Sequence, residues 1–131
     1  MSLRLDALPT TYAICRLAPD NDVPAWALRG SIWSIMRTLD ELSIVCEEGV
    51  LPATLPPETP CERGWRALRV AGPLDFSLTG ILAALTAPLA DAGISIFALS
   101  TYDTDYLLVR SEAFVAACTA LETAGYEIVV P

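Results

Sequence analysis

The residues best suited to chemistry lie between Gly72 and Arg110, in GPLDFSLTGILAALTAPLADAGISIFALSTYDTDYLLVR. Asp103 and Asp105 occupy an acidic turn near the end of this stretch. Near its start, the polar turn LDFSLTG leads into a predicted helix, whose free N–H groups and positive dipole end favour an anion. A helix N-terminus beside two carboxylates suits a zwitterion such as a free amino acid, provided that the fold brings the two turns together.

The helix is predicted from about Ser77 to Ala92, because apolar side chains recur there at helical spacing. Asp75 or Ser77 can cap its start, and Gly93 stands where a left-handed C-terminal residue belongs. Pro88 lies inside the helix and is expected to kink it, since proline lacks the backbone N–H. The apolar stripe consists of Leu78, Ile81, Leu82, Leu85 and Leu89.

The elements around this helix predict an α+β fold of the ferredoxin-like type. A second helix is expected from a Ser111 cap to about Ala124, with Gly125 as its stop. The order is β-α-β-β-α-β, in which the crossover makes the first two strands parallel, so their C-terminal ends share one edge of the sheet. The turns 74–80 and 100–105 should therefore be neighbours. The predicted strands are 65–71, 94–100, 105–110 and 126–130.

The first half of the chain resembles a degenerate copy of the second. It offers a strand over 12–17, a helical turn over 23–28 and a hairpin whose Thr38-Leu39-Asp40 aligns with Thr101-Tyr102-Asp103. In place of a second helix, LPATLPPETP (51–60) predicts an extended proline-rich connection. We expect a degenerate domain over 10–63 and a complete one over 64–131. They should share one continuous antiparallel sheet, because three strands without helices bury too little surface alone.

The element order, the turn-to-helix segment PLDFSLTGIL and the hairpin STYDTDYLLV resemble ACT domains. More narrowly, residues 10–131 resemble small bacterial tandem-ACT proteins related to the regulatory module of aspartate kinase and to cytosolic arginine sensors. The resemblance implies a regulatory, non-catalytic module that binds an amino acid or another small ligand. It also implies association through the sheet, which we expect to give a homodimer. The family's ligand position corresponds here to residues 72–80 and 100–105.

We therefore predict that ligand contacts come from the two turns. The helix start would hold a carboxylate, Gly80 would allow close approach, and the two aspartates would accept hydrogen bonds from an ammonium. The predicted ligand-binding residues are Leu74, Asp75, Phe76, Ser77, Leu78, Thr79 and Gly80, together with Ser100, Thr101, Tyr102, Asp103 and Asp105.

Simpler explanations exist for the same residues. Aspartate at a hairpin turn commonly bonds to the nearby backbone, with no ligand involved. Ser77 and Thr79 suit helix caps as well as ligand contacts. Two other functions stay open: an assembly module without a ligand, because the apolar content is high, and a small enzyme with Asp103 or Asp105 as base.

Composition narrows the function classes. The 131 residues carry a net charge of −8, which argues against nucleic acid and anionic membrane surfaces as partners. Histidine is absent, which removes Ser-His-Asp and Cys-His catalysis and makes a zinc site uncommon. No lysine and no glycine-rich phosphate motif is present, so ATP chemistry is not expected. We expect no cofactor and no metal.

Hydropathy and cysteine usage predict a folded cytoplasmic protein. The chain is 53% hydrophobic, with a mean hydropathy of +0.47, which implies a sizeable core. No apolar run approaches the length of a membrane span, and the N-terminus lacks the layout of a signal peptide. The four cysteines form no C-x-x-C motif; Cys15, Cys46 and Cys118 fall within apolar patterns and are expected to be buried thiols of a reducing compartment.

Overall fold

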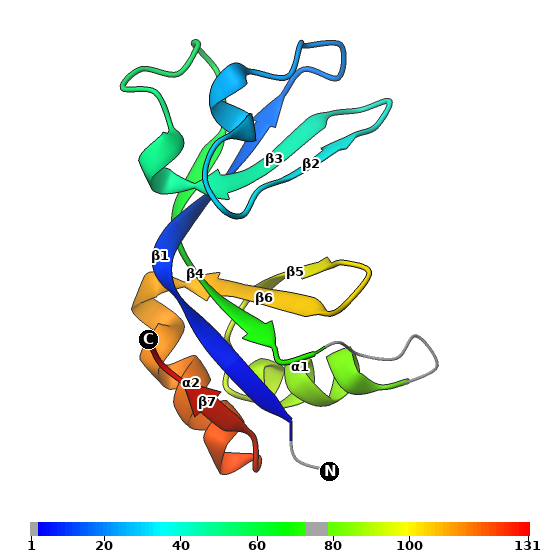
Figure 1. Ribbon diagram of the computed structural model, residues 1–131, viewed down its shortest axis with the longest axis vertical. Helices are drawn as coiled ribbons and strands as arrows, with labels where there is room; N and C mark the ends of the chain where they lie inside the picture. The colour runs from blue at the N-terminus through cyan, green and yellow to red at the C-terminus, as the bar shows by residue number, and fades with distance from the viewer. Residues whose placement is uncertain (1–2, 73–78) are drawn as a thin grey trace. The chain divides into compact units, whose positions relative to one another are not determined.

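Seven strands form one sheet in the computed structural model, which describes residues 3–72 and 79–131 (Figure 1). The strand order is β2-β3-β1-β4-β6-β5, and β7 pairs with β1. The elements are β1 (Arg4–Leu17), the 3-10 helix η1 (Ala25–Leu28), β2 (Ser34–Arg37), β3 (Leu42–Glu47), η2 (Glu48–Val50), β4 (Cys61–Val70), α1 (Ile81–Asp91), β5 (Ile96–Ser100), β6 (Asp105–Arg110), η3 (Ser111–Ala113), α2 (Phe114–Thr123) and β7 (Glu127–Val129). The predicted α+β, ferredoxin-like tandem with a shared sheet is confirmed.

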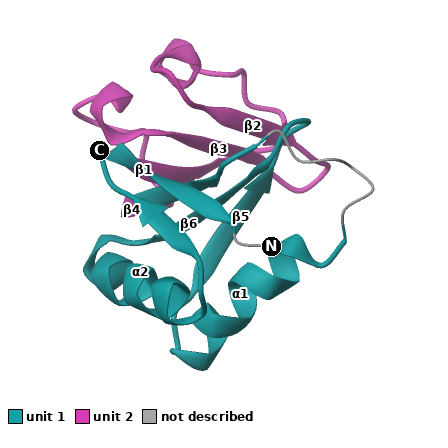
Figure 2. Cartoon of the chain, turned by 60° about the horizontal axis from the view of Figure 1, so that its bottom comes forward, with its two compact units in different colours: residues 1–9, 66–131 teal, residues 10–65 magenta. Residues whose placement is uncertain are grey.

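The chain divides into two compact units, each with its own core (Figure 2). Unit 1 comprises residues 1–9 and 66–131, and unit 2 comprises residues 10–65. Strands β1 and β4 each run through both units. The domain boundary predicted at 63/64 stays a prediction.

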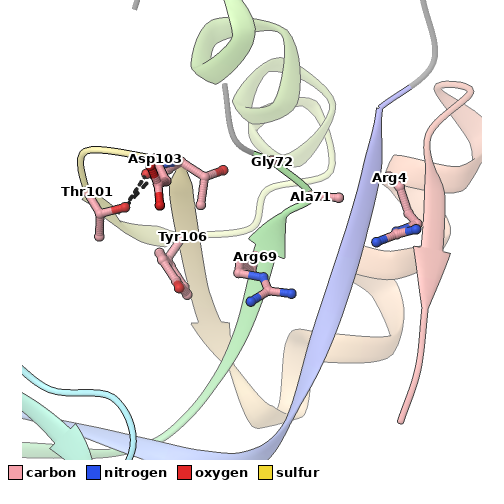
Figure 3. A pocket seen from close by; sticks show the side chains of 8 residues that line it. Arg4, Arg69, Ala71, Gly72, Thr101, Asp103 and Tyr106 are labelled. Carbon is pink, nitrogen blue, oxygen red and sulfur yellow. Dashed lines mark hydrogen bonds between the residues drawn. The ribbon is translucent and has the colours of Figure 1, made fainter. Parts of the chain in front are cut away.

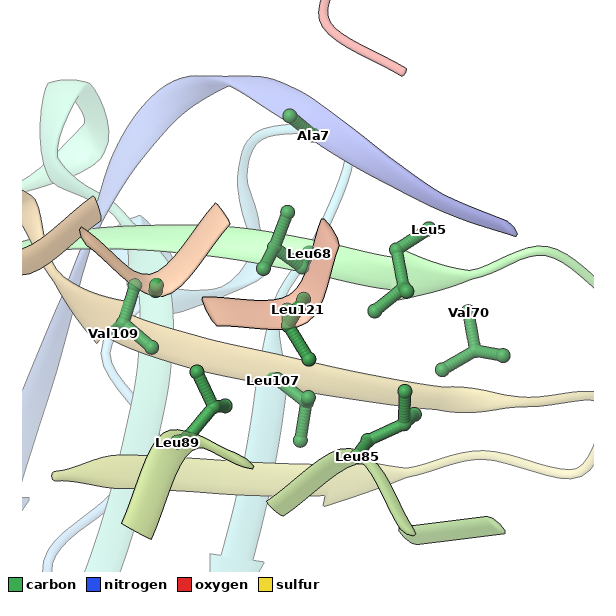
Figure 4. Close-up of a cluster of buried hydrophobic side chains, with 10 residues drawn as sticks. Leu5, Ala7, Leu68, Val70, Leu85, Leu89, Leu107, Val109 and Leu121 are labelled. Carbon is green, nitrogen blue, oxygen red and sulfur yellow. The ribbon is translucent and has the colours of Figure 1, made fainter. Parts of the chain in front are cut away.

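In unit 1, both helices cover the same face of the strands (Figure 2). Each helix contributes fully buried side chains, such as Leu85 of α1 and Leu121 of α2, which meet the inward residues of the sheet. Successive residues of a strand point to opposite faces of the sheet, so every second residue points toward the helices. The alternation of apolar and polar residues therefore predicts which residues are buried. The core is shown in Figure 4 and consists of Leu5, Ala7, Leu68, Val70, Leu85, Leu89, Leu107, Val109, Ala117 and Leu121.

The first strand is longer than the sequence indicated. The strand predicted over 12–17 begins at Arg4, and its early residues pair in parallel with β7, as in Arg4 with Glu127. Leu5 and Ala7 alternate with more polar neighbours and are buried in the core of unit 1, which explains the extra length. The first residues of β1 thus lie between β4 and the closing strand β7, whereas its later residues pair with β3.

Helix α1 starts later than predicted. The expected start at Ser77 is wrong, because α1 begins at Ile81 and its N-cap residue is Gly80, with no side-chain cap hydrogen bond. Gly80 has φ 75°, a left-handed conformation that a right-handed helix cannot continue. Pro88 inside the helix and left-handed Gly93 after it are found as predicted. The proposed caps Asp75 and Ser77 lie outside the described residues.

The second helix also begins differently from the prediction. Ser111 does not cap it, because Ser111–Ala113 form the 3-10 helix η3, and α2 follows with Ala113 at its N-cap. Alanine has no side-chain acceptor, so this helix start has no side-chain cap. The predicted stop at Gly125 is confirmed by its φ of 100°.

The two hairpins repeat each other closely. Thr38 donates its N–H to Glu41 C=O at 2.8 Å, and Thr101 donates to Thr104 C=O at 2.8 Å, 63 positions later (38 to 101). The same offset relates β3 to β6 and η2 to η3. The internal repeat suggested by the two turns therefore extends through the strand and the 3-10 helix that follow them.

At this offset, α2 corresponds to the proline-rich segment 51–60. Both stretches contain ten residues, but four of the ten in LPATLPPETP are proline. Proline removes backbone donors and crowds the preceding turn, so a helix cannot form there. Unit 2 keeps its own core instead, made of Ala13, Cys15, Leu17, Ala27, Leu42, Ile44 and Cys46.

Candidate functional site

The end of β4 meets the β5–β6 turn within unit 1. The Thr104 hydroxyl is buried and donates to the Val70 carbonyl at 2.6 Å. A buried hydroxyl needs such a partner, because an unpaired polar group in the interior is costly. The predicted convergence of the first two strand ends is thus found at Val70 and Thr104.

A hollow of about 260 Å³ opens beside this contact (Figure 3). It brings together the ends of β4 and β5 and the start of β1, and its wall carries both positive and negative side chains. Its volume is small for a ligand pocket, which suits a ligand of few atoms. The lining residues are Arg4, Arg69, Ala71, Gly72, Thr101, Asp103, Thr104 and Tyr106.

Two arginines dominate the charge of the hollow. Asp6 joins them: Arg4 Nε lies 3.1 Å from Asp6 Oδ1, and one Arg69 terminal nitrogen lies 3.0 Å from Asp6 Oδ2. The hydrogen bond from Arg69 is the main reason why the pKa of Asp6 is lowered, and Arg4 adds to it. The two arginine side chains are about half exposed, and each guanidinium group has more donors than the contact with Asp6 uses, so donors remain for another anion.

Asp103 supplies the negative charge among the described residues that line the hollow, and its side chain takes no part in closing the turn. The turn is closed by Thr101, whose Oγ1 accepts the Thr104 N–H at 3.2 Å and donates to the Thr104 carbonyl at 3.1 Å. Within residues 3–72 and 79–131, the Asp103 carboxylate makes no hydrogen bond or ion pair. Turn chemistry alone therefore does not account for the carboxylate at this position.

Asp105 has a local partner instead. Its Oδ1 accepts a hydrogen bond from the Ser100 hydroxyl at 2.6 Å, across the first pair of the β5–β6 hairpin. Neither residue lines the hollow. For this pair a local contact accounts for the carboxylate without a ligand, although its partner is a side chain and not the backbone group expected from the sequence.

Among the described residues, three more of the predicted contacts lie outside the hollow. Tyr102 is 80% exposed at the tip of the turn, and Thr79 and Gly80 are exposed residues outside the lining. Leu74, Asp75, Phe76, Ser77 and Leu78 lie outside the described residues. Of the twelve predicted residues, the structure places Thr101 and Asp103 in the hollow.

Sequence reasoning missed the arginines, Thr104 and Tyr106. Arg69 alternates with the buried Leu68 and Val70, so the period of two predicts its outward direction. Arg4 could not be found this way, because the strand that carries it was not predicted. Its contribution depends on β1 lying beside β4 and β7.

Comparison with known proteins identifies the class. A family model described as ACT domain matches residues 61–123, and a second model, described as an N-terminal domain, matches residues 10–54. A crystal structure of a protein from Agrobacterium tumefaciens superimposes with a TM-score of 0.89 and 37% identity, covering 100% of this chain and 95% of that one. The chain belongs to the ACT-domain proteins.

Within that class it shares its fold with aspartate kinase regulatory modules and part of its sequence with a cytosolic arginine sensor. The regulatory subunit of aspartate kinase from Thermus thermophilus shares the fold, with a TM-score of 0.65, 14% identity and coverage of 92% and 96%. The human cytosolic arginine sensor for mTORC1 subunit 1 is 37% identical over 59 residues. That match covers 44% of this chain and only 18% of the relative. The names of these two relatives describe a regulatory subunit and an amino-acid sensor.

Two further findings concern membranes and metals. Among the described residues, no helix is long and apolar enough to cross a membrane. In the same part of the chain, no three histidine, cysteine, aspartate or glutamate side chains are grouped to hold a metal ion.

Proposed function

We propose that this chain is a non-catalytic regulatory module that binds a free amino acid in the hollow of unit 1. Arg4 and Arg69 would bind the α-carboxylate, since guanidinium groups match the geometry of a carboxylate. Asp103 would accept hydrogen bonds from the α-ammonium, and Thr101 would add a neutral contact. The contacts predicted for residues 74–80 stay part of this proposal.

The single observation that carries the proposal is the uncompensated charge of the hollow. Asp103 has no hydrogen-bond or ion-pair partner within the described residues. The wall of the hollow also bears two arginines, which share the single carboxylate of Asp6. A zwitterion would satisfy both ends, while an uncharged ligand would leave the carboxylate without a cationic partner. The regulatory character of similar proteins supports the same conclusion.

A thermal-shift screen against the common amino acids tests this function. One or a few amino acids should stabilise the protein, because a ligand at about 100 times its Kd adds about 2.7 kcal/mol to the free energy of unfolding. Glycine amide and the matching 2-hydroxy acid, which lack one charge each, serve as controls. If no amino acid shifts the unfolding temperature at millimolar concentration, the proposed function is wrong.

We also propose that the chain works in the cytoplasm as a homodimer. Large apolar side chains are exposed, among them Val115 at 76%, Met36 at 66% and Tyr102 at 80%, and such side chains suit a partner surface. Sedimentation equilibrium should give twice the monomer mass at micromolar concentration. A monomer at high concentration, with and without amino acid, would exclude the dimer while leaving ligand binding untouched.

A further inference from the structure

A pair of thiols in unit 2 takes no part in the proposed ligand site. Cys15 of β1 and Cys61 of β4 place their Sγ atoms 2.8 Å apart, although 46 positions separate them in the chain. Beside them, Arg16 N–H donates to Pro60 C=O at 3.0 Å, so the two strands are hydrogen-bonded next to the cysteines. The backbone already holds the two side chains together, as a cross-link between them requires.

We propose that Cys15 and Cys61 form a redox modification site, at which a disulfide oxidant such as oxidised glutathione converts the two thiols into an intramolecular disulfide. The proposal is independent of amino-acid binding, because both cysteines belong to unit 2 and the hollow is lined by residues of unit 1. In the structure described here all four cysteines are free thiols.

The exposures of the thiols fix the order of the steps. Cys61 is partly exposed, whereas Cys15 is 1% exposed. The Cys61 thiolate attacks one sulfur of oxidised glutathione and forms a mixed disulfide, and the released glutathione thiolate takes up the proton that Cys61 lost. Cys15 then attacks Cys61 Sγ, and the second glutathione leaves as a thiolate that takes the proton of Cys15. Two protein thiols are oxidised, and one oxidised glutathione is reduced to two glutathione molecules.

Cys46 is the competing thiol. It is fully buried and lies opposite Ala13 on β1, two residues before Cys15. Burial raises the pKa of the Cys46 thiol to about 11 and also raises the pKa of Cys15, so neither reacts readily with an oxidant from solvent. This leaves Cys61 as the entry point and Cys15, at 2.8 Å, as its partner.

Mass spectrometry of the full-length protein tests the pairing. The protein is equilibrated with glutathione buffers of increasing oxidised fraction, alkylated, and digested with trypsin and then with a protease that cleaves after glutamate. The second digestion is needed because the tryptic peptide 38–63 contains both Cys46 and Cys61, while cleavage after Glu47 or Glu48 separates them. The expected product joins peptide 5–16, which carries Cys15, to the fragment that carries Cys61.

Variants and stability complete the test. Cys61→Ser should abolish the cross-link, whereas Cys46→Ser and Cys118→Ser, folded by circular dichroism, should keep it. The disulfide closes a long loop in the unfolded chain, so oxidation should raise the midpoint of thermal unfolding by several degrees in the wild type and not in Cys61→Ser. The proposal is overturned if, after equilibration of folded wild-type protein with oxidised glutathione, Cys15 is still alkylated once the protein is denatured. It is also overturned if the end product joins Cys61 to Cys46 or leaves Cys61 joined to glutathione.

Discussion

Replacing Asp103 by asparagine should weaken amino-acid binding about 10- to 100-fold, because a hydrogen bond to a charged group contributes about 1.5–3 kcal/mol. Asparagine keeps the size of the side chain and removes its negative charge. Since the Asp103 carboxylate has no partner within the described residues, the free energy of unfolding without ligand should change by no more than about 0.5 kcal/mol. Isothermal titration calorimetry with the amino acid selected by the thermal screen measures the loss.

The internal repeat supplies a matched control. Asp40 occupies the position of Asp103 in the equivalent turn of unit 2, and Arg16 donates to its backbone carbonyl at 3.1 Å. Asp40→Asn makes the same chemical change in the same type of turn and should leave the Kd unaltered. An analogue without the amino group separates the contacts further: it should bind wild type and Asp103→Asn with similar affinity. Equal losses for Asp40→Asn and Asp103→Asn would show that the carboxylate acts on folding or net charge rather than on the ligand.

Sequence reasoning succeeded wherever a local pattern determines the structure. Strand 105–110 was predicted with the bounds that β6 has, because a short continuous apolar run between an acidic turn and Ser111 leaves little choice. Gly93 and Gly125 marked the helix ends correctly, since a left-handed residue stops a helix whatever its surroundings. The turn at 101–104 was predicted because a polar segment separates two apolar runs there.

The misses have non-local causes. Residues 4–9 form part of a strand because they pair with β7 and pack into the core of unit 1. These partners are distant in the sequence, so the segment itself does not predict them. Because that strand was not predicted, Arg4 was missed, and with it one of the two positive side chains that line the hollow together with Asp103. The start of α1 was predicted too early because the apolar periodicity of the helix also includes residues before Gly80. The left-handed backbone of Gly80 prevents the helix from extending to those residues. A candidate site assembled from distant strands is thus only partly visible in the sequence.

Leu107→Ala should destabilise the protein by about 2–5 kcal/mol, as expected for a large-to-small change in a packed core. Leu107 lies on β6, is fully buried and belongs to the core of unit 1, between the sheet and the two helices (Figure 4). Small domains are stable by only about 5–15 kcal/mol, so this single change removes a large share of the total. Urea unfolding followed by tryptophan fluorescence and circular dichroism measures the loss.

Leu39→Ala is the matched control, because it deletes the same atoms from a side chain that is 97% exposed, and its effect should stay within about 0.5 kcal/mol. Ile44 occupies the position of Leu107 in the repeat, at the same offset of 63 (44 to 107), and is fully buried in the core of unit 2. Ile44→Ala should therefore cost about 2–5 kcal/mol as well, although unit 2 lacks both helices of unit 1. A small loss for Ile44→Ala beside a large one for Leu107→Ala would mean that the degenerate half has no packed core of its own. The two halves would then share the order of their strands, but unit 2 would contribute less than unit 1 to the free energy of unfolding.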